Sequence, residues 1–198
     1  MNKKLFSVAA LSLLLAFGFS GCKDDDNEPQ KNIVKLGAQS NATIGAFYSV
    51  SEKKVYTQAL AFENSAKIDL LCFYEVTDTQ SNYTTLSSPG ANITGIFTGE
   101  TSVTNFATKN LTKFTLPATE LTVAQFDLII DGDASIAAFY NATITSGNKK
   151  AKLLEVDDIY AFLTQDGTYG LFKVISLSNP ENEAGWIEFE LKLYKPTV

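Results

Sequence analysis

Alternation between apolar and polar positions is clearest near the C-terminal end of the chain. In Trp186–Tyr194, Ile187 and every second residue after it are apolar, and the residues between them are mostly charged. This period of two is typical of an antiparallel strand with one face on a core and the other facing solvent. Upstream, Ile159–Leu163 and Tyr169–Leu177 flank an Asp-Gly turn, which indicates a hairpin. With Ala151–Leu154, the last third of the chain is predicted to form a four-stranded meander.

The first half of the chain carries further strand signals. Ile68–Tyr74 is almost wholly apolar without alternation, which predicts a central strand that is buried on both faces. Shorter candidates rich in β-branched and aromatic residues lie around it. They are Ile33–Leu36, Ile44–Ser49 and Lys54–Thr57 before it, and Thr84–Ser88 after it.

The middle of the chain predicts short helices. The residues from Thr122 to Gln125 match a capping box, Asp133 is placed to cap a second helix, and Thr101–Ala107 predicts a further helical turn. The predicted fold is therefore mainly β, an antiparallel sandwich or curled sheet with two or three short inserted helices. The alternative is an α+β fold with a mixed sheet, in which Ile68–Tyr74 pairs in parallel with its neighbours.

The N-terminal residues have the layout of a removed targeting segment. Two lysines precede the apolar run Leu5–Phe19, which is shorter than the ~20 residues of a membrane-spanning helix. The following Ser-Gly-Cys, together with Phe19, resembles a bacterial lipobox. In that family a peptidase cuts before the cysteine, which then carries the lipid. The resemblance implies a signal peptide over residues 1–21 and lipidation of Cys22.

An acidic run, Lys23–Glu28, follows this cysteine directly. It resembles the export signal of surface lipoproteins from Bacteroidota. The resemblance implies an outer-membrane protein that faces the cell exterior. Residues 22–32 are then the lipidated cysteine with its flexible tether, and residues 33–198 a single β-rich globular domain.

The globular part also resembles uncharacterised surface lipoproteins of the same phylum. That resemblance implies a location and no activity. It rests on Ile68–Tyr74, Asn110–Phe114, Leu121–Asp127, Gly170–Val174 and Ile187–Glu190.

The composition excludes several classes of catalytic and binding site. The chain has no histidine and no arginine, so all 16 basic residues are lysine, and the formal net charge is −6. A Ser-His-Asp triad, a histidine-bearing zinc site and bidentate arginine recognition of phosphate or guanine are therefore excluded. The negative charge also disfavours nucleic acid as a partner. The membrane, reached through the lipid on Cys22, is the expected partner.

Aromatic side chains are the candidate ligand-binding residues. A flat ring can stack on the apolar face of a sugar while its polar edge stays hydrated. The candidates are Trp186 and Tyr194 on the outward face of the last strand, and Tyr140 and Tyr169 in or beside predicted loops.

Three aspartates are the candidate metal ligands. Asp127, Asp131 and Asp133 could gather oxygens around Ca²⁺, although their spacing is not that of an EF-hand loop. Local roles at a helix end and as an N-cap would explain the same residues. No other cofactor is expected.

These observations favour a lipid-anchored, non-enzymatic binding protein of the cell surface, with a glycan as the expected ligand class. One alternative is an adhesin or fimbria-like assembly subunit, which would present an open strand edge or groove to another surface protein. The other is a carboxylate-based glycoside hydrolase. Glu188 and Glu190 share a strand face and could supply its acids, but beside Lys192 they also fit a solvated surface.

Overall fold

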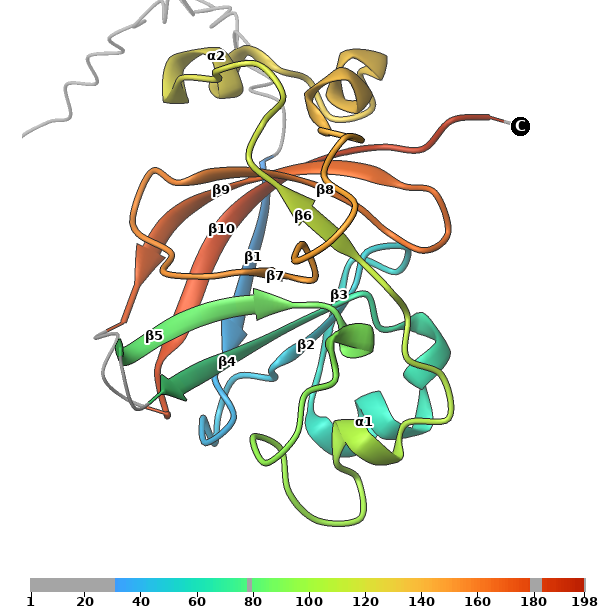
Figure 1. Cartoon of the computed structure of the whole chain (residues 1–198), viewed down its shortest axis with the longest axis vertical. Helices are drawn as coiled ribbons and strands as arrows, with labels where there is room; N and C mark the ends of the chain where they lie inside the picture. Colours follow the sequence, from blue (N-terminus) through green and yellow to red (C-terminus); the bar gives the residue numbers. More distant parts are fainter. Residues whose placement is uncertain (1–30, 78–79, 179–182, 198) are drawn as a thin grey trace, which may run out of the picture. The chain divides into compact units, whose positions relative to one another are not determined.

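Two five-stranded sheets, antiparallel at every pairing, form the framework (Figure 1). The computed structural model describes residues 31–77, 80–178 and 183–197. Sheet I consists, in spatial order, of β1 (Asn32–Gly37), β10 (Trp186–Tyr194), β9 (Tyr169–Leu177), β8 (Ile159–Leu163) and β6 (Lys113–Thr115). Sheet II consists of β3 (Lys54–Tyr56), β2 (Phe47–Ser49), β4 (Leu70–Thr77), β5 (Gln80–Ser87) and β7 (Lys150–Ala151).

The two sheets pack face to face around one apolar core. Phe172 and Phe189 of sheet I lie with ring centroids 5.7 Å apart, in one cluster with Leu70 and Leu86 of sheet II. All four side chains are fully buried. This arrangement confirms the predicted antiparallel sandwich. Because β4 pairs antiparallel with both β2 and β5, the alternative mixed sheet is wrong.

A second apolar cluster covers the outer face of sheet II. Phe47 and Phe73 project from this face and pack with Phe97 and Phe106 of the long segment that follows β5. Burial on both faces explains why the sequence of β4 is apolar without alternation. The short helices here are α1 (Gln58–Glu63), η1 (Ser65–Lys67), η2 (Pro89–Ala91) and η3 (Val103–Asn105). The sequence predicted η3 and did not predict α1.

Helical segments also cover the outer face of sheet I. Both predicted caps are present: α2 (Val123–Leu128) begins with a capping box between Thr122 and Gln125, and Asp133 accepts from Ser135 N at the start of η4 (Ala134–Phe139). Phe126 of α2 and Ile136 of η4 are fully buried on this face.

The helical segments over sheet I bury side chains of β10 that the sequence predicted to face solvent. Glu190 and Lys192 were expected on a solvated face, yet they are 1% and 9% exposed. Lys192 Nζ lies 2.8 Å from Glu190 Oε1, and Lys173 Nζ lies 3.7 Å from Glu190 Oε2. The ring of Phe126 lies against both lysine ammonium groups. A buried charge persists when it is paired, and here both signs are present under α2.

The predicted four-stranded meander is wrong in one strand. Only β8, β9 and β10 follow one another in sheet I. The segment at Ala151 instead contributes β7, which pairs with β5 of sheet II. The place beside β8 is taken by β6 from the middle of the chain. Both are strands of two or three residues, too short for their periodicity to specify a partner.

Candidate functional site

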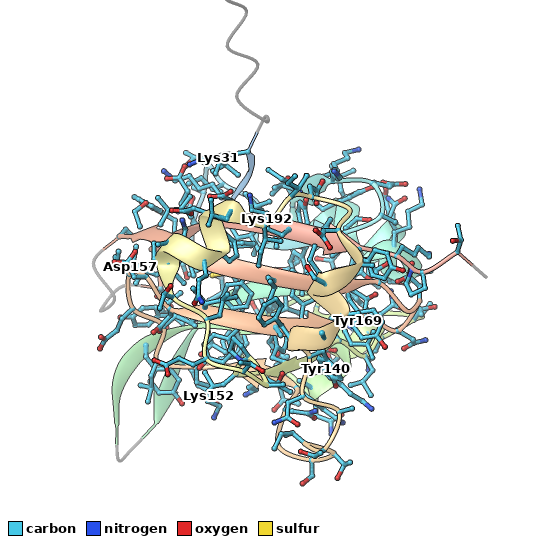
Figure 2. The ribbon with its side chains drawn as sticks, turned by 90° about the horizontal axis from the view of Figure 1, so that it is seen from above. Lys31, Tyr140, Lys152, Asp157, Tyr169 and Lys192 are labelled. Atoms are coloured by element: carbon cyan, nitrogen blue, oxygen red, sulfur yellow. The ribbon has the colours of Figure 1, made fainter. Side chains whose placement is uncertain are left out.

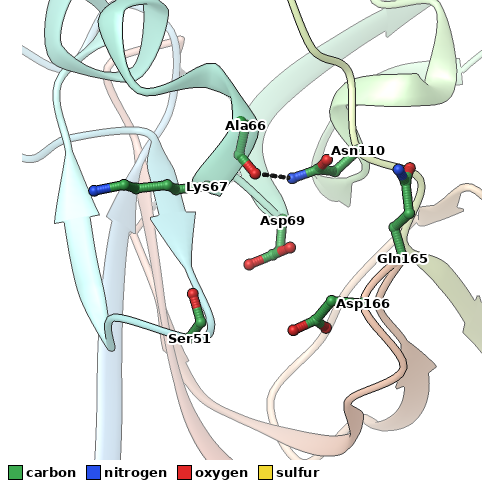
Figure 3. A pocket seen from close by; sticks show the side chains of 7 residues that line it. All are labelled: Ser51, Ala66, Lys67, Asp69, Asn110, Gln165 and Asp166. Carbon is green, nitrogen blue, oxygen red and sulfur yellow. Dashed lines mark hydrogen bonds between the residues drawn. The ribbon is translucent and has the colours of Figure 1, made fainter.

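A polar pocket of about 200 Å³ lies where loops of the two sheets meet (Figure 3). It is small beside the roughly 300–1,000 Å³ of sites for drug-sized ligands. Its size limits it to a small ligand or to one group of a larger ligand. The lining residues are Ser51, Ala66, Lys67, Asp69, Asn110, Gln165 and Asp166.

Asp69 is the buried carboxylate of this pocket. It directly precedes β4 and is only 7% exposed. Its Oδ2 accepts a hydrogen bond of 2.9 Å from Val50 N, while Oδ1 has no hydrogen-bond partner among the described residues. Burial raises the pKa of Asp69 to about 6, although the bond from Val50 opposes this shift. Asp69 is therefore mostly ionised near neutral pH, with one oxygen available to a ligand.

Asn110 presents a second acceptor. Its Nδ2 donates to Ala66 O at 2.9 Å and to Ile68 O at 3.0 Å, which fixes the orientation of the amide. Its Oδ1 makes no hydrogen bond within the described part of the chain. Thr112 Oγ1 donates to Asp69 O at 2.8 Å and ties this loop to the start of β4.

Gln165 supplies a donor from the hairpin between β8 and β9. Its Oε1 accepts from Leu111 N at 2.8 Å, which leaves Nε2 as the free end of the amide. The pocket thus combines two acceptors and one donor whose orientations are set by bonds to the backbone. A hydroxyl group both donates and accepts, so this set matches a hydroxyl-rich ligand.

Asp166 faces the same pocket from the hairpin turn but is engaged within the protein (Figure 3). Its Oδ1 accepts from Thr164 and Thr168, and its Oδ2 lies 2.7 Å from Lys195 Nζ. Burial opposes ionisation of this carboxyl, but the bonds from Lys195, Thr164 and Thr168 outweigh it and lower the pKa of Asp166 to about 2. Asp166 therefore stays anionic and holds the Asp-Gly turn in shape.

Three of the four predicted aromatic residues come together elsewhere, on the outer face of sheet I. Tyr169 and Tyr194 are cross-strand partners, and the rings of Tyr140 and Tyr169 lie 6.0 Å apart, edge to face (Figure 2). All three are half-buried against the cluster under α2 and η4. Trp186 lies at the opposite end of β10, with Lys35 Nζ 3.5 Å from the centre of its ring. None of the four lines the Asp69 pocket.

The three predicted metal ligands take separate partners. Asp127 pairs with Lys173, Asp131 Oδ1 accepts from Leu193 N at 2.7 Å, and Asp133 caps η4. Within residues 31–77, 80–178 and 183–197, no group of three or more histidine, cysteine, aspartate or glutamate residues is placed to hold a metal ion. The predicted lipidation residue, Cys22, lies outside the described residues.

Asp69, Asn110 and Gln165 were not predicted as site residues. One signal was present in the sequence, because Asp69 is the single charged residue within the apolar run Ile68–Tyr74. A charged residue inside a predicted buried strand either forms an ion pair or belongs to a functional site. Asn110 and Gln165 stand in loops, and no local pattern distinguishes them.

The fold defines this chain as a two-sheet antiparallel β-sandwich with helical segments on both outer faces. No family model matches the chain, and no curated protein matches it.

Among solved structures, the chain is similar to a DUF4466 family protein from Parabacteroides merdae, with a TM-score of 0.45 and 15% sequence identity. The match covers 84% of this chain and 54% of that protein, so this chain spans about half of its length. Among the described helices, none has the length and apolar character needed to cross a membrane.

Proposed function

We propose that this protein is a lipid-anchored binding protein of the cell surface, which recognises one sugar-sized, hydroxyl-rich group in the Asp69 pocket. The lipid on Cys22 would hold it at the outer membrane, facing the cell exterior. The expected ligand is the end of a glycan, and the role is binding without catalysis.

The observation that carries this proposal is the set of spare hydrogen-bonding groups in the pocket. Asp69 Oδ1 and Asn110 Oδ1 accept and Gln165 Nε2 donates, while the other end of each side chain is bound to the backbone. Asp69 and Asn110 are both 7% exposed, so their orientations are fixed before a ligand arrives. Preorganised polar groups lower the entropic cost of binding.

Binding is tested with the full chain on a glycan array, followed by calorimetric titration of the strongest sugar. Asp69→Asn replaces an anionic acceptor, and a hydrogen bond to a charged group contributes roughly 1.5–3 kcal/mol. We expect the affinity of this variant to fall about 10- to 100-fold. Gln165→Glu, which turns the donor into an acceptor, should weaken binding as well.

The matched control is Glu63→Gln, which removes one negative charge from α1, outside the pocket. Its affinity should equal that of the unchanged protein. An array without any bound sugar, or full affinity in Asp69→Asn, would contradict the proposal.

The anchor is tested separately by growing cells with a tagged fatty acid. The unchanged protein should carry the label and be digested by protease added to intact cells. Cys22→Ala should lose the label. An unlabelled protein, or one that external protease cannot reach, would refute the surface anchor and leave the pocket result standing.

A second candidate function is the carboxylate-based hydrolase, favoured by the opposite pKa shifts of Asp69 and Asp166 in one pocket. Two carboxyls whose environments separate their pKa values are the pattern of an acid and its partner base. Binding remains the better supported function because both oxygens of Asp166 are engaged by Thr164, Thr168 and Lys195.

The pair considered from the sequence, Glu188 and Glu190, gives the hydrolase no support. Glu190 is buried in ion pairs, and Glu188 accepts from Ser176 Oγ at 3.1 Å. Hydrolysis of chromogenic glycosides by the unchanged protein, lost in Asp69→Asn, would favour the hydrolase over the binding protein.

A further inference from the structure

A second hollow, of about 550 Å³, lies beside the first residue of β8, Ile159. β6 pairs with β8 from Lys113, opposite Leu163, to Thr115, opposite Ala161. The pairing ends there, and the next two residues, Leu116 and Pro117, line the hollow. Continued in register, Pro117 would stand opposite Ile159. Proline has no backbone N–H and cannot extend the ladder.

This departure leaves one residue of β8, Ile159, without a paired residue on the side of β6. In an antiparallel sheet, successive residues of a strand direct their backbone N–H and C=O to opposite neighbours. Thr164 N donates to Thr168 O at the hairpin, so Phe162 and Tyr160 also direct these groups toward β9. Ile159 therefore directs its N–H and C=O toward the side of β6. Among the described residues, neither group has a backbone partner outside the regular strand ladders, and β6 ends before reaching it. An unpaired strand edge is a template for another extended chain.

We call this hollow the β8 groove. It is lined by apolar side chains and by an acidic rim. Leu116, Leu121, Val123 and Ile159 contribute apolar side chains, and Leu116 is 66% exposed. The charged lining residues all have the same sign, and they are Glu120, Asp157 and Asp158. In Figure 2, Asp157 lies near one end of the strands of sheet I, while Tyr140 and Tyr169 lie near the other end.

We infer that the β8 groove docks a short extended segment of a partner protein, with apolar side chains flanked by lysine or arginine. The segment would pair with the N–H and C=O of Ile159, place its apolar side chains on Leu116 and Leu121, and direct its basic groups to the acidic rim. Strand addition of this kind takes affinity from main-chain bonds and specificity from side-chain pockets. The groove shares no residue with the Asp69 pocket, so the two proposals stand independently.

The probe is a capped pentapeptide with lysine at both ends and valine, isoleucine and valine between them. It is titrated into the isotope-labelled full chain and followed by the amide NMR signals. We expect saturable shifts centred on Ile159 and Leu116, weaker at high salt because the rim contacts are electrostatic. A peptide with glutamate at both ends, and one with proline in place of isoleucine, should each bind at least about fivefold more weakly.

The rim is tested with Glu120→Lys and with Asp157→Asn, because asparagine tolerates the positive φ of 72° at that position. Each should weaken the lysine peptide about threefold to tenfold. Glu63→Lys, a matched charge reversal on α1, should leave binding unchanged.

Three results would overturn the inference: no shifts at Ile159, equal binding of the lysine and glutamate peptides, or rim variants that bind like the control. Two further measurements address other occupants. Concentration-dependent dimerisation lost in Leu116→Asn would assign the groove to a second copy of this chain. Binding to phosphatidylethanolamine–phosphatidylglycerol vesicles lost in the same variant would assign it to lipid.

Discussion

Among single residues, Asp69 is the one on which the proposed binding site depends most. This carboxyl interrupts an apolar run, is 7% exposed and has one oxygen without a hydrogen-bond partner among the described residues. A buried carboxyl without a cationic partner beside it destabilises the folded state when ionised. Carboxyls with a strongly shifted pKa cluster at functional sites, which favours a role of Asp69 in binding beside its bond to Val50 N.

Asp69→Asn should therefore change the dependence of stability on pH. The folded pKa of about 6 lies above the ordinary value of 3.8, so the folded state holds the proton more tightly between these pH values. Asp69 then lowers the free energy of unfolding as pH rises from about 4 to 6, by roughly 3 kcal/mol in total. Asparagine does not titrate, and it still accepts from Val50 N through its carbonyl oxygen.

Urea unfolding between pH 4 and 8 measures this effect. The variant should lack the decrease assigned to Asp69 and be more stable than the unchanged protein at pH 7.5. Parallel pH profiles for the two proteins would show that Asp69 does not titrate in this range.

Gly170 provides a second prediction at this scale. A Cβ added here would lie 2.1 Å from Cζ of Phe162, whose ring is fully buried. Gly170→Ala should lower the free energy of unfolding by about 2–4 kcal/mol, since overpacking displaces a core ring. Gly99→Ala, at a position with φ of 82° and open space around it, should cost only about 1 kcal/mol. Equal costs would contradict the close contact across β8 and β9.

At the scale of elements, α2 is a helix of six residues that covers a charged cluster. Phe126 is fully buried above Lys173 and Lys192, and Asp127 pairs with Lys173. A helix of this length has little stability of its own. Its cap and its packing therefore hold it in place.

Thr122→Ala should destabilise α2 over the charged cluster. Losing an N-cap of this kind costs about 1 kcal/mol, because Gln125 N loses its acceptor. Hydrogen exchange at the amides of α2 should become about fivefold faster, while the amides of β4 keep their rates. Thr119→Ala, at an exposed position before the helix, is the control. Unchanged exchange in α2 would mean that packing alone holds it.

Elements with strong local signals were predictable from the sequence. Alternation in Trp186–Tyr194, the Asp-Gly hairpin and the capping box at Thr122 each correspond to a feature of the structure. The two-residue strand β7 and the burial of Glu190 were not predictable in this way, because each depends on a partner from a distant part of the chain.

At the scale of the whole molecule, the Asp69 pocket forms only when both sheets are assembled. Its residues come from the turn at Ser51, the segment from η1 to Asp69 that leads into β4, the loop at Asn110 and the hairpin at Gln165. Nothing in the local sequence places these four segments together. For this reason the sequence predicted the fold but not the pocket.

Ligand binding should stabilise the assembled protein as a whole. A sugar present at 100 times its Kd would add about 2.7 kcal/mol to the free energy of unfolding. The same sugar concentration should add much less to Asp69→Asn. Thermal unfolding with and without the sugar measures both values, and equal stabilisation of the two proteins would place the ligand outside the pocket.

The most direct test of the pocket is the titration of the Asp69 carboxyl carbon by NMR, without and with the saturating sugar selected by the array. In the free protein, we expect a pKa of about 6. In the complex, we expect a clearly lower pKa, because hydroxyl groups that donate to Asp69 Oδ1 favour its ionised form. A sugar that binds while the pKa of Asp69 stays the same would contradict the claim that this carboxylate receives the ligand.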